Sequence, residues 1–214
     1  MPRANTTRRT PEMKLLLAAK RLFCKEGIHA TGVARIIKEA GVSRKTLYER
    51  YGSKDNLLRA VFAEEAAMWV GWFEKDVARE GQGLDAQINL LFDLLKSWFS
   101  GHGFYGCVFI NAVAEHEKQD GWIRDVAANH RERINAFIEK MLEAEELPEA
   151  RQATEKISFI IDGAIIAAMI GSSGDFVADI ACAACHDVIE AHRSQRHRST
   201  SELDGYPEPT GLVM

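Results

Sequence analysis

Apolar side chains near the start of the chain recur at intervals of three and four residues, which is the spacing of one face of an α-helix. Leu15, Leu22 and Phe23 share such a face. Pro11 suits the first turn of a helix, and Gly27 suits its C-terminal end. The pattern therefore predicts a first helix between Pro11 and Gly27.

Two shorter helices are predicted next, joined by a tight Ala-Gly-Val-Ser turn. Thr31 is an N-cap type of residue before the second helix, which Gly41 closes. Ser43 is the predicted N-cap of a third helix, Arg44 to Tyr51. A helix, a tight turn and a short basic helix form the layout of a helix-turn-helix DNA-binding unit.

The rest of the chain continues with helical patterns and shows no strand-like alternation. Ser53 begins a long apolar-periodic helix that passes Phe73, and later helices are expected near 84–100, 105–117, 120–145, 149–171 and 174–193. The expected fold is all-α with about nine helices. It combines an N-terminal three-helix helix-turn-helix domain with a larger helical domain for ligand binding and dimerisation.

Composition and pattern divide the chain into four expected segments. Residues 1–10 are a flexible basic arm, residues 11–54 the helix-turn-helix DNA-binding domain, and residues 55–193 the helical ligand-binding and dimerisation domain. Residues 194–214 are polar and interrupted by Pro and Gly, which predicts a disordered tail.

Charge is distributed unevenly along the sequence. Residues 1–60 contain 14 Lys and Arg against 5 Asp and Glu, whereas residues 61–214 contain 13 against 26. A basic N-terminal part on an acidic body is typical of a protein whose one end meets phosphate. The acidic charge of the remainder mildly disfavours an anionic small-molecule ligand.

Neither a secretory signal nor a membrane span is expected. Lys20 and Arg21 interrupt the apolar run Leu15–Ala19 too early for a signal peptide. The uncharged run from Gly163 to Gly174 falls short of the roughly 20 residues that a span requires. These patterns predict a cytoplasmic protein, in which the cysteines are expected to be free thiols.

The third helix carries the candidate DNA contacts. Arg44 and Lys45 lie on its first turn, where recognition helices meet base edges, and Thr46 can touch a base or a phosphate. Tyr48 lies one turn later and can reach a phosphate, and Lys54 lies at the start of the next helix. Two alternatives stay open: that Arg44 and Lys45 touch phosphate alone, and that the N-terminal residues of the short helices act only as caps.

The stretch TGVARIIKEAGVSRKTLYERYGSKDNLLRAV resembles the helix-turn-helix of TetR-family transcriptional regulators. The resemblance implies a sequence-specific DNA-binding regulator, a homodimer on a double-stranded palindromic operator, and most commonly a repressor released by a small-molecule effector. It also implies that Tyr48 and Lys54 clamp phosphates. Thr31 and Ser43 join the expected DNA contacts, because a cap residue lies where the helix N-terminus can bind an anion.

The last two predicted helices, 149–171 and 174–193, are the candidate dimer surface. Alanines among large apolar residues permit close helix approach, and the resemblance implies a four-helix dimer bundle here. Packing within one subunit is the alternative for any of them. The expected interface residues are Ile161, Ile165, Ala168, Val177, Ala181, Ala184 and Val188.

Aromatic residues are dense between the predicted DNA-binding domain and the dimer helices, which indicates an apolar cavity with a few polar orienting groups such as His130. Asp162 is the most informative, because a buried carboxylate needs a partner. Ordinary core packing is the alternative for each aromatic residue. The expected cavity residues are Trp69, Phe73, Phe92, Trp98, Phe109, Asn111, Trp122, Phe137 and Asp162.

Motifs of catalysis are not found in the sequence: it contains no Walker loop, HExxH, nucleophile elbow or dinucleotide fingerprint, so an enzyme is not expected. No cofactor or metal is expected either, because the run from Glu115 to Asp120 is better explained as a solvated polar face. The alternative function is a thiol-based redox-responsive regulator that uses Cys107 or the pair Cys182 and Cys185.

Overall fold

The computed structural model describes residues 10–77, 83–115, 121–171 and 173–203, and within these ranges the chain forms nine α-helices, one π-helical turn and no strand. The helices are α1 (Pro11–Glu26), α2 (Val33–Ala40), α3 (Arg44–Tyr51), α4 (Lys54–Trp72), α5 (Leu84–Phe99), α6 (Val108–Glu115), α7 (Gly121–Ala144), α8 (Ala150–Met169) and α9 (Gly174–Leu203). The π-helical turn, Phe73–Val77, follows α4 directly. The all-α fold expected from the sequence is confirmed.

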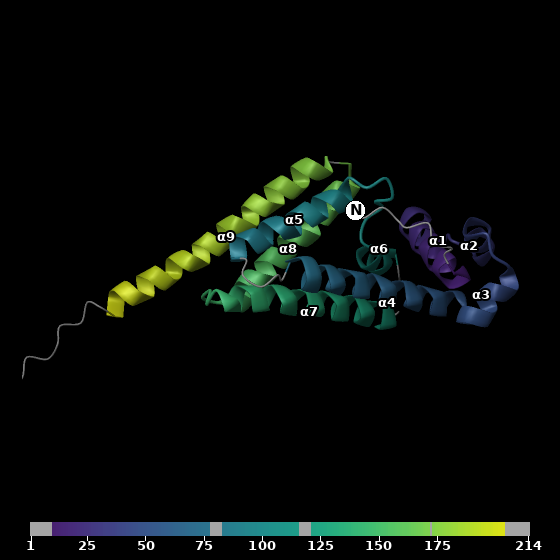
Figure 1. Ribbon diagram of the computed structural model, residues 1–214, viewed down its shortest axis with the longest axis horizontal. Coiled ribbons are helices and arrows are strands. Elements are labelled where there is room, and N and C mark those ends of the chain that lie inside the picture. Colours follow the sequence, from purple (N-terminus) through teal and green to yellow (C-terminus); the bar gives the residue numbers. More distant parts are fainter. Residues whose placement is uncertain (1–9, 78–82, 116–120, 172, 204–214) are drawn as a thin grey trace, which may run out of the picture.

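The first three helices pack into a small unit at one end of an elongated molecule, and we call α1–α3 the head and the remaining helices the body (Figure 1). Pro11 begins α1, and Gly27 ends it with a φ of 91°. Ser43 caps α3 by accepting a hydrogen bond from the Thr46 amide at 3.1 Å. Leu47, on the opposite face of α3, is fully buried. The cap at Ser43 therefore fixes where α3 starts, and its apolar face holds the helix against the rest of the head.

The predicted N-cap role of Thr31 is wrong. Gly32 is the N-cap of α2 and makes no side-chain cap bond. Thr31 is fully buried, and its hydroxyl donates to the carbonyl oxygens of Gly27 at 2.6 Å and Leu22 at 3.3 Å. Because those carbonyls belong to the end of α1, Thr31 closes α1 instead of starting α2.

α4 leads from the head into the body, where it lies along α7 (Figure 1). α5, α8 and α9 pack together at the far end, and α6 lies between α1 and α7 (Figure 1). The buried apolar residues form one cluster that extends from Leu15 in α1 to Ile189 in α9. The head is therefore anchored to the body through α1, α4 and α6.

Two predicted boundaries differ from the structure. The helix expected from residue 105 begins at Val108. α9 continues to Leu203, whereas a disordered tail was expected from residue 194. The reason is local, because residues 194–203 contain neither Pro nor Gly, and the first breaker is Gly205. Residues 1–9 and 204–214 lie outside the described residues, so most of the expected arm does too.

None of the helices in the described ranges combines the length and apolarity that a bilayer crossing requires.

Candidate DNA-binding surface and effector cavity

One face of α3 presents cations and a phenol to solvent. Arg44, Lys45 and Tyr48 are all exposed. The Arg44 guanidinium carbon lies 5.8 Å from the centre of the Tyr48 ring, and Lys45 Nζ lies 3.6 Å from Glu49 Oε1. The partner of Lys45 is itself exposed, so its attraction is weak in water. This face therefore keeps two available cations beside a hydroxyl group.

The other expected DNA contacts have different surroundings. Ser43 Oγ and Thr46 Oγ1 lie 2.8 Å apart, and both side chains take part in the cap of α3. Lys54 is half-buried and donates its ammonium hydrogen to the Ile28 carbonyl. Thr31 cannot expose its hydroxyl to DNA without opening the head, which removes it from the expected contacts.

A cavity of about 520 Å³ lies in the body, with walls from α4, α6, α7 and α8. Three of the expected residues line it: Trp69, Phe109 and Asp162. Most of the remaining wall is apolar, and it includes Ile110, Val113, Ile134, Ile161 and Ile165. A void of this size with few polar groups has the character of a small-molecule site.

The polar groups of the cavity come mainly from α7 and α8. Arg131 pairs with Asp162, which supplies the partner that the carboxylate was expected to need. The imidazole of His130 stacks on Phe109, with ring centres 3.9 Å apart. Burial, with a smaller contribution from Arg133, lowers the pKa of His130 from 6.5 to about 4, so the ring is neutral at pH 7.

Six expected cavity residues do not line this cavity. Phe92 is buried in the core, Trp98 packs edge-on against Trp69, and Asn111 donates its amide to the Tyr105 carbonyl at 2.9 Å. The remaining three are Phe73, Phe137 and Trp122. Spacing in the sequence identifies an aromatic side chain as buried, but not the void that it faces.

Those three residues have other packing partners. Phe73 and Phe137 pack together, with ring centres 4.6 Å apart, and line a separate hollow of about 650 Å³. The guanidinium of Arg59 lies 3.8 Å from the centre of the Trp122 ring. Arg131 has no signal of its own in the sequence, although the need of Asp162 for a partner indicated a cation nearby.

A carboxylate at the end of α6 joins the cavity wall to the head. Glu115 accepts hydrogen bonds from the backbone amides of Ile28 at 2.6 Å and His29 at 2.5 Å. A Cβ at Gly27 would lie 3.1 Å from Glu115 Oε1, so glycine permits this close approach. Sequence spacing does not reveal this role, because Glu115 is 87 residues from Ile28 in the chain. Residues 116–120 lie outside the described residues, and so does most of the acidic run considered for metal binding.

Comparison with known proteins identifies the family. Residues 15–61 match the family described as "Bacterial regulatory proteins, tetR family". A TetR-family transcriptional regulator from Streptomyces coelicolor has the same fold, with a TM-score of 0.77, 25% identity, and coverage of 85% of this chain and 95% of that one. Residues 15–61 are thus a TetR-family N-terminal domain, and the chain as a whole is similar to TetR-family transcriptional regulators. Its N-terminal helices are therefore the DNA-binding part of the protein.

Curated relatives agree with this assignment. The chain is 25% identical to the HTH-type transcriptional regulator AcrR of Shigella flexneri over 71% of its own length and 73% of that protein. It is 30% identical to the HTH-type transcriptional activator FasR of Mycolicibacterium smegmatis over 42% of each. The chain thus spans less than half the length of that second relative. These homologues are regulators and not enzymes.

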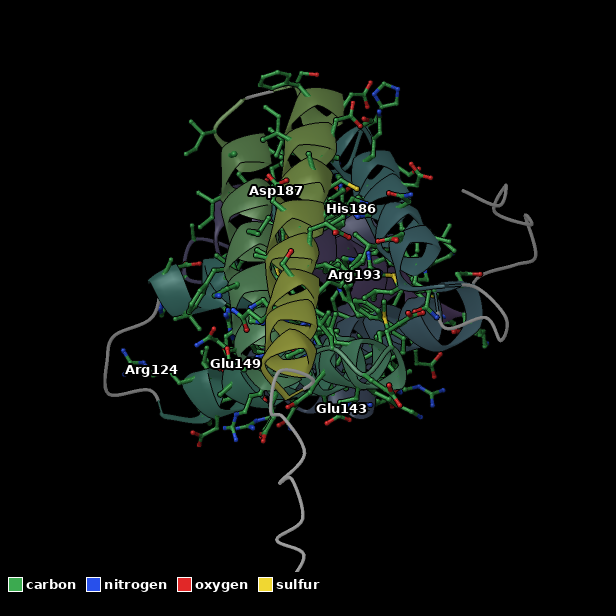
Figure 2. The ribbon with its side chains drawn as sticks, turned by 90° about the vertical axis from the view of Figure 1, so that its left-hand side faces the viewer. Arg124, Glu143, Glu149, His186, Asp187 and Arg193 are labelled. Atoms are coloured by element: carbon green, nitrogen blue, oxygen red, sulfur yellow. The ribbon has the colours of Figure 1, made fainter. Side chains whose placement is uncertain are left out.

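The TetR-family body leaves an apolar face exposed on α8 and α9. Phe159 on α8 is 65% exposed and Ile170, the C-cap of α8, is 80% exposed, and Phe176 and Ile180 are exposed on α9. Figure 2 shows α8 and α9 side by side at the front, with His186 and Arg193 on the side toward α5. Both of those side chains pair with Asp85 of α5.

The expected dimer residues occupy a different face of the same two helices. Ile161, Ile165, Val177 and Ala181 are buried within the subunit, and the first two line the cavity. Ala168, Ala184 and Val188 are half-buried. Periodicity alone does not distinguish two apolar faces of one helix, so the exposed face is a second candidate for the interface.

The thiols of this regulator are held in their protonated form. Burial raises the pKa of Cys107 to about 11 and that of Cys185 to about 12, and it also raises the pKa of Cys182. Since the thiolate is the reactive form, these environments disfavour redox sensing. The alternative of a thiol-based regulator is therefore not favoured.

Proposed function

We propose that this protein is a homodimeric repressor that leaves a palindromic operator when a small molecule fills the 520 Å³ cavity. Its place of action is the cytoplasm, where its DNA target lies. The observation that carries the proposal is the contact of Glu115 with the head, because the helix that lines the cavity also holds the turn between α1 and α2. In this division, the head binds DNA, and the body binds the effector and the second subunit.

The proposed DNA contacts centre on α3. Arg44 or Lys45 reads base edges in the major groove, and Tyr48 bonds a phosphate. Ser43 and Thr46 lie at the N-terminus of α3, where backbone amides favour an anion. Lys54 binds a phosphate by giving up its hydrogen bond to the Ile28 carbonyl, because a hydrogen bond to an anionic oxygen is stronger.

The N-terminus of α2 replaces the buried Thr31 among the proposed contacts. Gly32 provides no side-chain cap, so the first amides of α2 remain open to an acceptor such as a phosphate oxygen.

The proposed dimer forms through the exposed face of α8 and α9. Regulators of this family work as dimers. Large apolar side chains are exposed to solvent on these two helices and at the C-cap of α8: Phe159, Ile166, Ile170, Phe176 and Ile180. A symmetric pairing of this face with its copy gives a four-helix bundle that removes those side chains from water.

Coupling between the cavity and DNA follows from the position of α6. A ligand that displaces Ile110 or Val113 moves the helix whose last residue, Glu115, holds the backbone of Ile28. Lys54 of α4 binds the carbonyl of the same residue. A shift of α6 is therefore transmitted to the α1–α2 turn, and a ligand that prefers the shifted state weakens DNA binding.

Selection of bound sequences from a random duplex pool at physiological salt tests the function. The expected result is a palindrome whose half-sites lie about one helical turn apart, roughly 34–36 Å centre to centre. The variant Ile180→Asp, which charges the dimer face, should enrich no palindrome. If the wild-type protein enriches no sequence at all, the proposal of a sequence-specific regulator is wrong.

A further inference from the structure

Three buried nitrogen atoms in the described residues have no hydrogen-bond partner, and all three belong to residues that line the 520 Å³ cavity. They are Trp69 Nε1, His130 Nδ1 and Arg131 Nη2. A buried polar atom without a partner destabilises the fold. The atoms themselves have almost no exposed surface, but their residues line one cavity, and a molecule that enters it lies nearest to them.

The chemistry of these atoms specifies what that molecule must offer. An indole N–H and a guanidinium N–H are donors only, and a neutral imidazole nitrogen is a donor in one of its two tautomers. Arg131 uses Nη1 for Asp162, so Nη2 remains available for a second acceptor. The cavity therefore requires a ligand with acceptor atoms, and two of the three nitrogens cannot be satisfied by a donor.

The charges on the cavity wall favour a ligand whose acceptor group is negatively charged. The wall carries the guanidinium groups of Arg124 and Arg131 against the single carboxylate of Asp162. Arg124 is exposed at the cavity and is not paired in any described contact, while Asp162 is already engaged by Arg131. The local excess of one positive charge contrasts with the acidic body as a whole, which had suggested a ligand that is not anionic.

The remainder of the wall excludes a small polar anion. Ile110, Val113, Ile134, Ile161 and Ile165 surround most of the cavity. An ion without an apolar part would leave this surface unfilled, whereas an apolar chain or ring would gain the free energy of its own burial.

We propose that the effector is an apolar organic acid whose carboxylate binds Arg131 and whose apolar part occupies the space enclosed by α6, α7 and α8. This inference deepens the proposed function, since it takes the same cavity as the effector site. Binding is measured on the full-length protein without DNA, so its outcome is separate from that of the operator selection.

The test compares three probes that share one chain and differ in the charge of the head group: decanoate, decanol and decylamine. Isothermal titration calorimetry on the wild-type protein is expected to show decanoate binding at least tenfold more tightly than decanol, with decylamine weakest. Equal affinity for decanoate and decanol, a preference for decylamine, or no binding of decanoate would overturn the proposal.

Variants locate the carboxylate. Arg131→Gln should lower decanoate affinity at least tenfold and change decanol affinity less than threefold. Asp162→Asn should raise decanoate affinity, because it releases the Arg131 guanidinium from its competing partner. The double variant Arg131→Gln with Asp162→Asn removes both charges, so it controls for the charge that either single variant leaves unpaired. Unchanged decanoate affinity in both Arg131→Gln variants would refute the assignment to Arg131.

Discussion

Buried polar groups in the head are hydrogen-bonded within the chain, whereas three buried nitrogens at the cavity of the body are not. In the head, Thr31 is fully buried and its hydroxyl bonds two carbonyls, and Ser43 satisfies an amide of α3. In the body, Trp69, His130 and Arg131 each bury a nitrogen atom without a partner among the described residues. Buried polar groups are normally paired, so the three unpaired nitrogens agree with the proposal that a ligand binds at the cavity.

The largest expected effect concerns packing. Leu47→Ala should lower the free energy of unfolding by about 2–5 kcal/mol, because the side chain is fully buried in the head. Val113→Ala, on the cavity wall and 38% exposed, should cost less than about 1 kcal/mol because it creates no new enclosed void. Urea unfolding of both variants measures the contrast. Equal losses would show that the cavity wall is packed as tightly as the head.

The next effect concerns DNA. Arg44→Ala should weaken binding to the selected operator by about 1–3 kcal/mol and weaken binding to random DNA much less. Lys75→Ala removes the same charge from an exposed position after α4 and serves as the control. Fluorescence anisotropy with both duplexes distinguishes base reading from phosphate contact. An equal loss on the two duplexes would assign Arg44 to phosphate alone.

A pH effect should appear in the body. The pKa of His130 is lowered from 6.5 to about 4 in the folded protein, so between these values the unfolded chain binds more protons. Stability should therefore fall as the pH drops through this window, and His130 should account for about 2 kcal/mol of the loss between pH 7 and pH 5. His130→Phe keeps a ring against Phe109 and should reduce the loss by that amount. Urea unfolding at the two pH values provides the comparison, and an identical loss in the variant would contradict it.

The smallest effect concerns the contact between the two regions. Glu115→Gln keeps one acceptor oxygen for the amides of Ile28 and His29, so it should cost about 1 kcal/mol. Hydrogen exchange of those two amides should become faster. Glu145→Gln alters a similar bond, to the Leu84 amide at 3.3 Å, within the body, and should leave the head amides unchanged. Unchanged exchange in Glu115→Gln would mean that the carboxylate does not restrain the turn.

Features set by neighbouring residues could be predicted from the sequence, whereas features set by contacts between distant segments could not. The cap at Ser43, the end of α1 at Gly27 and the limits of α3 depend on neighbouring residues, so spacing located them. Cavity and coupling residues depend on contacts between distant segments. Arg131 and Asp162 are 31 residues apart, and Glu115 and Ile28 are 87 apart. Trp98 was expected in the cavity because aromatic density shows burial and not position.

The dimer face illustrates the same limit in one helix. α8 is apolar on two sides, and the sequence does not say which side packs against its own subunit. Folding assigned Ile161 and Ile165 to the interior and left Phe159, Ile166 and Ile170 in solvent. Thr31 was mistaken for a cap because a threonine before a helix has the same local pattern whether its hydroxyl faces forward or back.

The most direct test of the account asks whether filling the cavity alone weakens DNA binding. Ala127→Phe places a ring at a half-buried position of the cavity wall on α7, without any ligand. With the selected operator, the account predicts an affinity at least tenfold lower than that of the wild type, with a free energy of unfolding that is no lower, and a smaller loss when Glu115→Gln is added. Unchanged operator affinity in a stably folded Ala127→Phe variant would contradict the claim that the cavity controls the head.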